Sequence, residues 1–222
     1  GNLHADVKPH EADVFILAVP TPFKGDKEPD LSFVESATRE IAPFVKEGNL
    51  IILESTSPVG TTEKVQKWVL EERTDLVGKN LYFAHCPERV LPGKIVEELP
   101  HNDRIIGGID AESTKKTVAF YGHFVTGALL STDARTAEMA KLTENSFRDV
   151  NIAFANELSI ICDKLDIDVW ELIRLANRHP RVNILQPGPG VGGHCIAVDP
   201  WFIVDSAPHE ARLIRVAREV ND

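Results

Sequence analysis

Apolar residues in the first part of the chain fall into short continuous runs, at 13–19, 50–53, 81–84, 104–106 and 128–131. Continuous rather than alternating apolar runs are typical of strands that are buried on both faces of a sheet. The segments between the runs have helical spacing and predict helices at 31–46, 61–72 and 111–124. Asp30 is the expected N-cap of the first of them. Strands that alternate with helices predict parallel βαβ units in a doubly wound α/β sheet.

The pattern changes after residue 131. Residues 135–165 contain neither Gly nor Pro and have helical apolar spacing, so they predict one long helix. A second helix is expected at 169–177, and a last one from about residue 209. We therefore expect an α/β part over residues 1–131 and an all-helical part over 132–222.

Composition narrows the classes of function. The formal net charge is −10, and the chain has no long basic run, so binding to nucleic acid is not expected. No apolar stretch has the length of a membrane span, so no membrane partner is expected. The three cysteines lie far apart, which favours a reducing, cytoplasmic setting over a disulfide framework. No Cys/His grouping has the spacing of a zinc site, so no metal is expected.

Polar residues follow three of the predicted strands. Thr21 lies in "PTP", Thr56 lies in "STSP", and Glu88 and Arg89 lie in "CPERV". Ligands of open α/β sheets bind at the carboxyl ends of the strands, so these side chains are candidates for a cofactor or substrate site. The alternative is that Pro, Ser and Thr simply end the strands.

One face of the predicted long helix changes from polar to apolar along its length. Lys141, Asn145 and Arg148 occupy positions i, i+4 and i+7, and Ile152 and Ala155 continue the stripe. Such a stripe is either the wall of a polar site that runs into the core or a charged surface with accidental periodicity.

The segment "PGPGVGGHCIAVDPW" at 187–201 places Cys195 among glycines. Flexible glycines let a substrate approach the sulfur, and an ammonium such as Lys141 would favour the thiolate. Asp199 can act as a base or position a water molecule. The glycine spacing matches neither a Walker loop nor a dinucleotide loop, which disfavours a phosphate site. The alternative is a small buried hydrophobic residue, the usual role of a lone cysteine.

Together, "AVPTPF", "ILESTSPVGTT", "CPERVLPG", "NDRIIGG", "AEMAKLTENSFRDVNIAFANEL" and "PGVGGHCIAVDPWF" resemble, in this order, the UDP-glucose/GDP-mannose dehydrogenase family over nearly the whole chain. The resemblance implies the second half of a Rossmann-like parallel sheet that binds NAD, followed by a helical central domain. It implies NAD-dependent, four-electron oxidation of the C6 alcohol of a UDP-sugar by a homodimer. Val198 stands where UDP-glucose dehydrogenases usually carry Lys. This favours the subgroup that converts UDP-N-acetyl-D-mannosamine to UDP-N-acetyl-D-mannosaminuronate for polysaccharide biosynthesis.

The resemblance also implies roles for individual residues. Cys195 would attack the aldehyde to form a thiohemiacetal and then a thioester, while Lys141 and Asn145 hold the oxyanion. Asp199 would manage protons and water, and Glu88 would take part in hydrolysis of the thioester. Residues that match substrate-contacting positions are Arg89, Val90, Arg148, His179, Arg181 and Gly192. Thr21 and Thr56 match positions on the NAD side.

Two further expectations concern the extent of the chain and the alternatives. The family's opening G-x-G-x-x-G unit has no counterpart in "GNLHADVKPHEADVF", and the chain stops at "VAREVND". We therefore expect a central segment that by itself binds NAD poorly and turns over little. One alternative is a non-catalytic dimerisation module. The other is a cysteine acyl-transfer enzyme such as a hydrolase, which needs a histidine base for Cys195 that the adjacent His194 is badly placed to supply.

Overall fold

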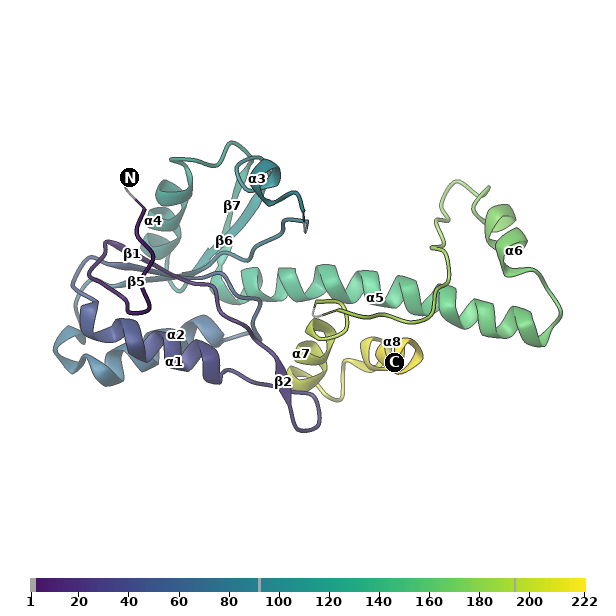
Figure 1. Ribbon diagram of the computed structural model, residues 1–222, viewed down its shortest axis with the longest axis horizontal. Helices are drawn as coiled ribbons and strands as arrows, with labels where there is room; N and C mark the ends of the chain where they lie inside the picture. The colour runs from purple at the N-terminus through teal and green to yellow at the C-terminus, as the bar shows by residue number, and fades with distance from the viewer. Residues whose placement is uncertain (1–2, 92, 194) are drawn as a thin grey trace. The chain divides into compact units, whose positions relative to one another are not determined.

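The computed structural model describes residues 3–91, 93–193 and 195–222 (Figure 1). It contains two compact units. The sheet unit comprises Gly1–Thr21 and Asp30–Lys141, and the helical unit comprises Pro22–Pro29 and Leu142–Asp222. One helix, α5 (Ala134–Lys164), belongs to the sheet unit at its start and to the helical unit over the rest of its length. The two functional domains expected from the sequence, divided after residue 131, remain a prediction.

The sheet unit has the predicted α/β architecture, and a strand forms at each of the five predicted places. The five-stranded sheet has the order β1 (Val14–Leu17), β4 (Leu50–Leu53), β5 (Tyr82–His85), β6 (Arg104–Gly108) and β7 (Leu129–Asp133). The first three strands are parallel to one another. β6 runs antiparallel to β5, and β7 runs parallel to β6. The sheet is therefore mixed, whereas the sequence predicted a parallel one.

The reversal at β6 has a local cause. A parallel connection needs a crossover, usually a helix that spans the face of the sheet. Among the described residues of the segment 86–103, the only helix is the four-residue α3 (Ile95–Glu98). This short segment brings the chain back to the edge of the sheet at which β5 ends. There Arg104, at the start of β6, contacts Glu88, which follows β5.

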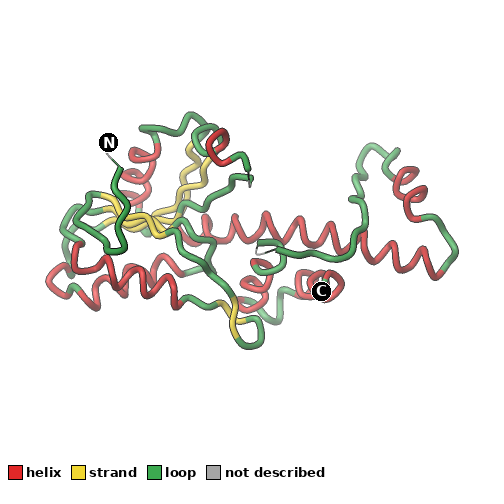
Figure 2. Tube along the Cα trace, viewed as in Figure 1, coloured by secondary structure: helices red, strands yellow, loops and turns green. Residues whose placement is uncertain are grey.

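Helices cover both faces of this sheet (Figure 2). They are α1 (Ser32–Ile41), α2 (Thr61–Glu72) and α4 (Ala111–Tyr121), and 3₁₀ turns follow at Ala42–Phe44 and Thr74–Leu76. Alternate residues of β4 enter two different cores, because successive strand side chains point to opposite faces. Ile51 and Leu53 pack in the core that includes residues of α1 and α2. Leu50 and Ile52 pack in the core that includes Tyr121 of α4.

Burial on both faces, which the sequence predicted for all the strands, holds for β4 but is wrong for the edge strands. All four residues of β4 are buried. Ile16 in β1 is 43% exposed and Leu130 in β7 is 49% exposed. Both strands lie at the edges of this sheet, where each has one neighbouring strand instead of two.

Carboxylates stabilise the helix starts. Asp30 accepts a hydrogen bond from the Ser32 backbone N–H (3.0 Å), close to its expected capping role, although Leu31 occupies the N-cap position. The start of α2 has no cap of its own. Buried Glu138 of α5 instead accepts from the backbone N–H groups of Gly60 (2.6 Å) and Thr62 (2.8 Å). Burial raises the pKa of Glu138, and the hydrogen bonds from Thr62 oppose this shift. A negative group at a helix N-terminus is favourable, so Glu138 fixes the first turns of α5 on α2.

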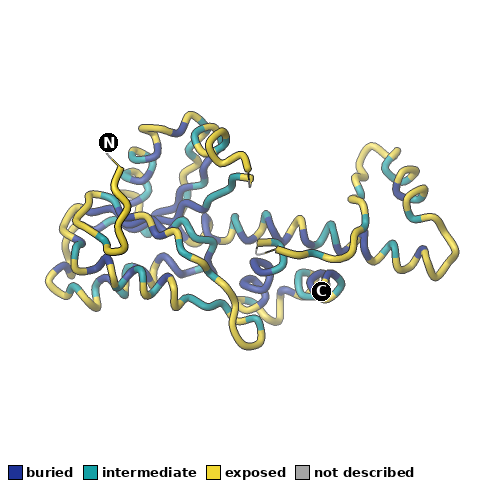
Figure 3. Tube along the Cα trace, in the orientation of Figure 1, coloured by how far each residue is buried: buried dark blue, intermediate teal, exposed yellow. Residues whose placement is uncertain are grey.

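The helical unit contains α6 (Val169–Ala176), α7 (Asp199–Ser206), α8 (Arg212–Asn221) and a hairpin of β2 (Phe23–Lys24) with β3 (Glu28–Pro29). The sequence predicted the long helix, α6 and α8. It missed α7 and the hairpin. The signal for α7 is Asp199-Pro200, since proline suits the first turn of a helix. Half of α6 and most of the segment that follows it are exposed (Figure 3). Within the described residues, no helix is long and apolar enough to cross a membrane.

The histidine at the end of β5 gives a test of the sheet core. His85 is fully buried, and neither ring nitrogen has a hydrogen-bond partner among the described residues. Burial lowers the pKa of His85 from 6.5 to about 3. The unfolded chain therefore binds the proton more tightly than the folded chain. The contribution of neutral His85 to the free energy of unfolding is complete above pH 6.5. It declines by ~1.4 kcal/mol per pH unit as the pH falls from 6.5 toward 3.

We expect His85→Leu to remove this decline. In urea unfolding followed by fluorescence of Trp68, the single tryptophan of the sheet unit, the wild type should lose about 2 kcal/mol more than the variant between pH 7 and pH 5. His123→Leu, at an exposed histidine of the same unit, serves as the control. Equal pH dependence in wild type and His85→Leu would contradict the prediction.

Candidate functional site

The strand ends of the sheet unit bring Thr21 and Thr56 together. The hydroxyl of Thr21 donates to the backbone carbonyl of Thr56 (2.6 Å). Beside them, the hydroxyl of Ser55 accepts from the Val19 backbone N–H (2.7 Å). The segments after β1 and β4 therefore present hydroxyl groups at one edge of the sheet. Ser55 was not singled out from the sequence, although its place beside Thr56 in the same "STSP" segment was a signal.

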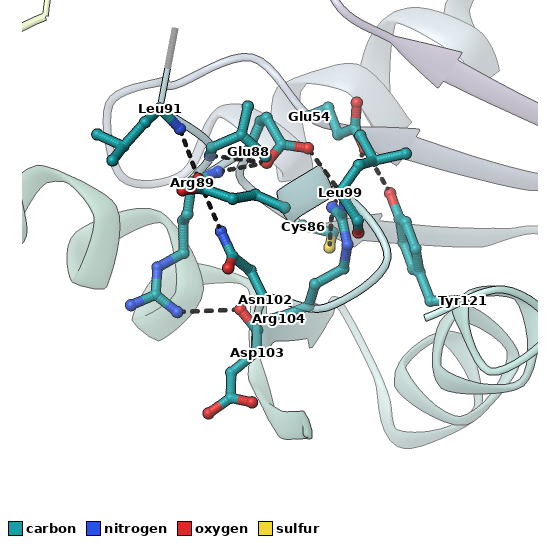
Figure 4. A network of polar contacts seen from close by, with 12 residues as sticks. Glu54, Cys86, Glu88, Arg89, Leu91, Leu99, Asn102, Asp103, Arg104 and Tyr121 are labelled. Carbon is teal, nitrogen blue, oxygen red and sulfur yellow. Dashed lines mark hydrogen bonds and ion pairs between the residues drawn. The ribbon is translucent and has the colours of Figure 1, made fainter. Parts of the chain in front are cut away.

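Glu88, which follows β5, has both carboxylate oxygens engaged (Figure 4). Oε1 accepts from the backbone N–H groups of Arg89 (2.6 Å) and Val90 (3.0 Å). Oε2 accepts from the guanidinium of Arg104 (2.9 Å). Charge-assisted hydrogen bonds of this kind are strong and directional, so the carboxylate has a defined orientation.

Arg104 lies at the centre of a buried polar cluster with Glu54, Cys86, Glu88 and Tyr121, as Figure 4 shows. Its side chain is only 4% exposed. Besides Glu88, it contacts Glu54 Oε1 (3.5 Å) and Cys86 Sγ (3.8 Å), and it lies over the ring of Tyr121 (4.7 Å). The Tyr121 hydroxyl donates to Glu54 (2.8 Å). We name these five residues the Arg104 cluster.

Of the Arg104 cluster, sequence reasoning assigned a role only to Glu88. The signal it missed was position. Glu54 directly follows the buried run "LIIL", and Arg104 begins the next apolar run. A charged residue beside a buried strand needs a partner, and these two charges are opposite.

Burial determines the charge states in the Arg104 cluster. It raises the pKa of Glu54, while the Tyr121 hydrogen bond and the Arg104 charge act in the opposite direction. It also raises the pKa of the Cys86 thiol to about 11, against the opposing effect of Arg104. Cys86 is therefore a neutral thiol at pH 7, which makes it a poor nucleophile.

In the helical unit, Asn145 of α5 and Asp199 of α7 form a buried pair. Asn145 Nδ2 donates to Asp199 Oδ2 at 2.5 Å, and both residues are no more than 5% exposed. The backbone carbonyl of Cys195 accepts from the N–H groups of Val198 (3.1 Å) and Asp199 (2.9 Å). Cys195 therefore lies on the turn that leads into α7. All three cysteines are free; Cys86 and Cys162 are buried, and Cys195 is exposed.

The remaining predicted residues lie in more open places. Lys141 is half-buried on α5, one turn before Asn145. Arg148 is exposed and does not share the burial of Asn145, so the predicted polar stripe is interrupted there. His179 and Arg181 are exposed, and the Arg181 backbone N–H donates to His179 Nδ1 (3.3 Å).

Gly192 is exposed, and no atom lies within 4 Å of the place where its Cβ would be. Arg89 and Val90 are half-buried next to Glu88. His194, the nearest candidate base for Cys195 in the hydrolase alternative, lies outside the described residues. No group of His, Cys, Asp or Glu in the described ranges can hold a metal ion.

A sheet with helices on both faces and polar residues at the ends of its parallel strands defines a Rossmann-type α/β protein. The model of the UDP-glucose/GDP-mannose dehydrogenase family, NAD binding domain, matches residues 1–125. The model of the same family's central domain matches residues 135–222. The chain belongs to the UDP-glucose/GDP-mannose dehydrogenase family.

Individual relatives agree with this assignment. The chain is 64% identical over 230 residues to a UDP-N-acetyl-D-mannosamine dehydrogenase of Campylobacter jejuni, with 100% of this chain and 56% of that protein aligned. It is 62% identical to an NDP-N-acetyl-D-galactosaminuronic acid dehydrogenase of Ralstonia solanacearum, with 100% and 54% aligned. The solved UDP-D-ManNAc dehydrogenase of Pyrococcus horikoshii superposes with a TM-score of 0.89 at 46% identity and covers 96% of this chain and 50% of that one. The chain thus spans about half the length of the curated relatives it matches.

The residues at the strand ends fit one portion of NAD. The N–H groups at the start of α2, a usual place for a phosphate, are occupied by the Glu138 carboxylate. The hydroxyl groups of Thr21 and Ser55 are neutral donors and acceptors. Neutral hydroxyl groups can hydrogen-bond the uncharged parts of a dinucleotide, whereas the Gly60 and Thr62 N–H groups are already taken by Glu138 and are not offered to a phosphate.

The Arg104 cluster gives a test of stability. In Arg104→Met, the Glu54 and Glu88 carboxylates lose the cation between them. We expect a loss of about 3–5 kcal/mol in the free energy of unfolding, measured by urea titration with Trp68 fluorescence. Arg104→Lys should lose less, because it keeps the charge but not the forked guanidinium.

The matched control is Arg135→Met, which breaks an exposed ion pair with Glu63 in the same unit and should cost under about 1 kcal/mol. If Arg104→Met costs no more than Arg135→Met, the cluster is not a stabilising element of the sheet unit.

Proposed function

We propose that this chain carries the catalytic residues of an NAD-dependent UDP-sugar 6-dehydrogenase that oxidises UDP-N-acetyl-D-mannosamine to the uronate. The observation that carries the proposal is the buried Asn145–Asp199 pair, whose α7 partner also binds the backbone of the exposed Cys195. An amide donor, a carboxylate and an accessible thiol are the groups that covalent aldehyde oxidation needs.

NAD would supply a hydride acceptor for each of the two oxidations, so two molecules of NAD, bound in turn, would take the four electrons. The chain's own residues supply covalent catalysis. Cys195 Sγ attacks the aldehyde carbon and forms a thiohemiacetal, and its oxidation gives a thioester that water hydrolyses. The intermediate stays attached to the protein between the two oxidations, so the aldehyde is not released.

Asn145 and Lys141 are the proposed donors to the negative oxygen that develops at C6. The Asn145 amide has two N–H groups, and the hydrogen bond to Asp199 occupies one of them. The other is available for the oxyanion, and the contact with Asp199 keeps the amide in its orientation. Lys141, one turn earlier on α5, adds a positive charge. Asp199 accepts and returns protons during attack and hydrolysis.

Glu88 is the proposed acceptor for the water that hydrolyses the thioester. Its two oxygens already accept three hydrogen bonds, which orient the carboxylate while lone pairs remain for a water molecule. We assign Thr21 and Thr56 to the NAD side. Proposed substrate contacts are Arg89, Val90, Arg148, His179, Arg181 and Gly192.

The choice of sugar rests on Val198 and on the relatives. Val198 is 8% exposed and packs with Phe202 in the apolar core of the helical unit. The side chains of this core are apolar, so a lysine in place of Val198 would have no charged partner among them. The Campylobacter relative is named for UDP-N-acetyl-D-mannosamine, and the Ralstonia relative is named for an N-acetylated galactosaminuronic acid. Both names support an N-acetylated sugar nucleotide. Three free cysteines support a reducing, cytoplasmic setting.

We also propose that the chain forms a homodimer through α5. Phe147, Phe154 and Ile161 recur every seven residues and are 69%, 56% and 44% exposed. This spacing places them on one stripe, away from the face that buries Leu142 and Asp149. A continuous exposed apolar stripe favours an identical partner helix. The same stripe is also expected in a non-catalytic dimerisation module. An NAD titration distinguishes the two, because the enzyme binds NAD and the dimerisation module does not.

Cys195→Ala tests the chemistry. With NAD and UDP-N-acetyl-D-mannosamine, we expect about two NADH per sugar in the wild type and at most about one in the variant, with trapped aldehyde and at least ~10³-fold less uronate. The assay uses the chain joined to any coding sequence that adjoins it, because the chain by itself is expected to bind NAD poorly and to turn over little. Cys162→Ala, at a buried cysteine of the helical unit, is the control and should behave as the wild type. Uronate formation at the wild-type rate by Cys195→Ala would exclude a covalent role for Cys195.

Phe154→Asp tests the dimer. Light scattering after size exclusion should give the dimer mass for the wild type and the monomer mass for the variant, because a charge on the stripe opposes its burial. Phe33→Asp changes an exposed phenylalanine of α1 outside the stripe and should leave the dimer intact. A monomeric wild type, or a dimeric Phe154→Asp, would contradict the proposal.

A further inference from the structure

The glycine-rich arm before Cys195 is held from one side by two buried asparagines. The Gly188 backbone N–H donates to Asn156 Oδ1 (2.9 Å), and the Val191 backbone N–H donates to the backbone carbonyl of Asn221 (3.4 Å). The arm has little packing of its own, because no atom lies within 4 Å of a Cβ at Gly188, Gly192 or Gly193. Its position therefore depends on these backbone hydrogen bonds.

The two asparagine side chains are bonded to each other and have defined orientations. Asn156 Nδ2 donates to Asn221 Oδ1 (2.8 Å), and Asn221 Nδ2 donates to the Asp149 backbone carbonyl and to Asp149 Oδ1 (2.9 Å each). Asn156 is 7% exposed and Asn221 is 3% exposed. If either amide turned over, a donor would face a donor in a buried place, which is costly. The donor and the acceptor of each hydrogen bond in the series Gly188, Asn156, Asn221 and Asp149 are therefore determined.

A buried ion pair fixes the far end of this chain of bonds. Arg218 of α8 donates to Asp149 Oδ1 (2.7 Å), and the two side chains are 1% and 0% exposed. Apolar residues of similar size would stabilise such a place at least as well, because burying two charges is expensive. A charged pair does, however, impose one relative position on its two helices. Arg218 also binds Asp222, which in turn accepts from Lys27 of the β2–β3 hairpin.

We propose that Asn156 and Asn221 are positioning residues for Cys195: they clamp the arm at Gly188 and Val191 and so hold the thiol at the reacting carbon. The inference rests on the proposed function of Cys195. On its other side the cysteine is already tethered, through its backbone carbonyl, to the first turn of α7. The backbone is thus held at Val191 on one side and at the turn from Cys195 to Val198 on the other.

The geometry of Gly190 supports the clamp. This glycine has φ +118°, and a Cβ at its position would lie 3.2 Å from the Asn221 carbonyl oxygen. The arm thus approaches Asn221 closely at a residue whose backbone conformation favours glycine. Covalent catalysis needs this precision, because a displacement of about 1 Å at the reacting atoms can cost ~10²-fold in rate.

Two pairs of variants test the clamp. Gly188→Pro removes the N–H donated to Asn156 and leaves the Asn156, Asn221 and Asp149 side chains unsubstituted, and Gly188→Ala keeps the N–H and adds a methyl group to open space. Asn156→Ala removes the acceptor. Its control is Asn151→Ala on the same helix, where the amide donates to the Phe147 carbonyl one turn earlier. Circular dichroism and urea unfolding identify any variant that does not fold, and Gly188→Pro then carries the test.

The first measurement is hydrogen exchange at 187–193, which does not depend on activity. We expect exchange at least ~10-fold faster in Gly188→Pro and Asn156→Ala, and unchanged exchange in the two controls. The second measurement is the oxidation of supplied aldehyde, compared with the first oxidation of the alcohol. We expect aldehyde oxidation to fall ~10–100-fold in the two test variants, with the KM for NAD and the alcohol step unchanged.

The possible failures are distinguishable. Unchanged exchange in both test variants would overturn the clamp, whatever the activity. Faster exchange with wild-type aldehyde oxidation would overturn the positioning role while leaving the clamp. Wild-type protein, joined to any coding sequence that adjoins it, that neither oxidises the aldehyde nor forms a thioester at Cys195 would overturn the proposed function itself.

Discussion

The polar groups buried along α5 need partners within the fold, and those partners decide where the functional segments lie. An unpaired polar group in an interior costs several kcal/mol, so a partner within the fold is strongly favoured. In the sheet unit, Glu138 is satisfied by the start of α2. In the helical unit, Asn145 is satisfied by Asp199, and Asn156 is satisfied by Asn221 and the glycine-rich arm. One helix with polar residues on its buried face thus organises segments that lie far from it in the sequence.

The Arg104 cluster applies the same rule to charge. Arg104 is buried, so it requires acceptors, and both carboxylates that it meets come from strand ends. Glu88 gains a fixed orientation from this contact and from two backbone N–H groups. The antiparallel return of β6 makes the arrangement possible, because it brings Arg104 to the edge where β5 ends. The departure from a fully parallel sheet therefore has a consequence for the candidate site.

The sequence predicted the parts of the fold that depend on local pattern. The buried run at 50–53, the Gly- and Pro-free stretch at 135–165 and the helix predicted at 169–177 all formed as expected. The strand direction of β6 could not be predicted in this way, because it depends on where the segment 86–103 returns. The Asn145–Asp199 contact joins residues that both drew attention in the sequence. The partners Arg104, Asn156 and Asn221 did not, since a buried polar residue looks like a surface residue until its neighbours are known.

The exposure of the three thiols determines how the protein would respond to oxidation. Cys86 and Cys162 are buried, and Cys195 is exposed on a turn lined by glycines. Because oxidation of a thiol requires access to it, Cys195 is the thiol that peroxide would reach first, and the product would be a sulfenic acid. Neither of the other two cysteines is accessible to condense with that product and protect it as a disulfide. Recovery then depends on small thiols from outside the chain, and slow supply of them leads to the sulfinic acid, which does not revert by simple thiol exchange.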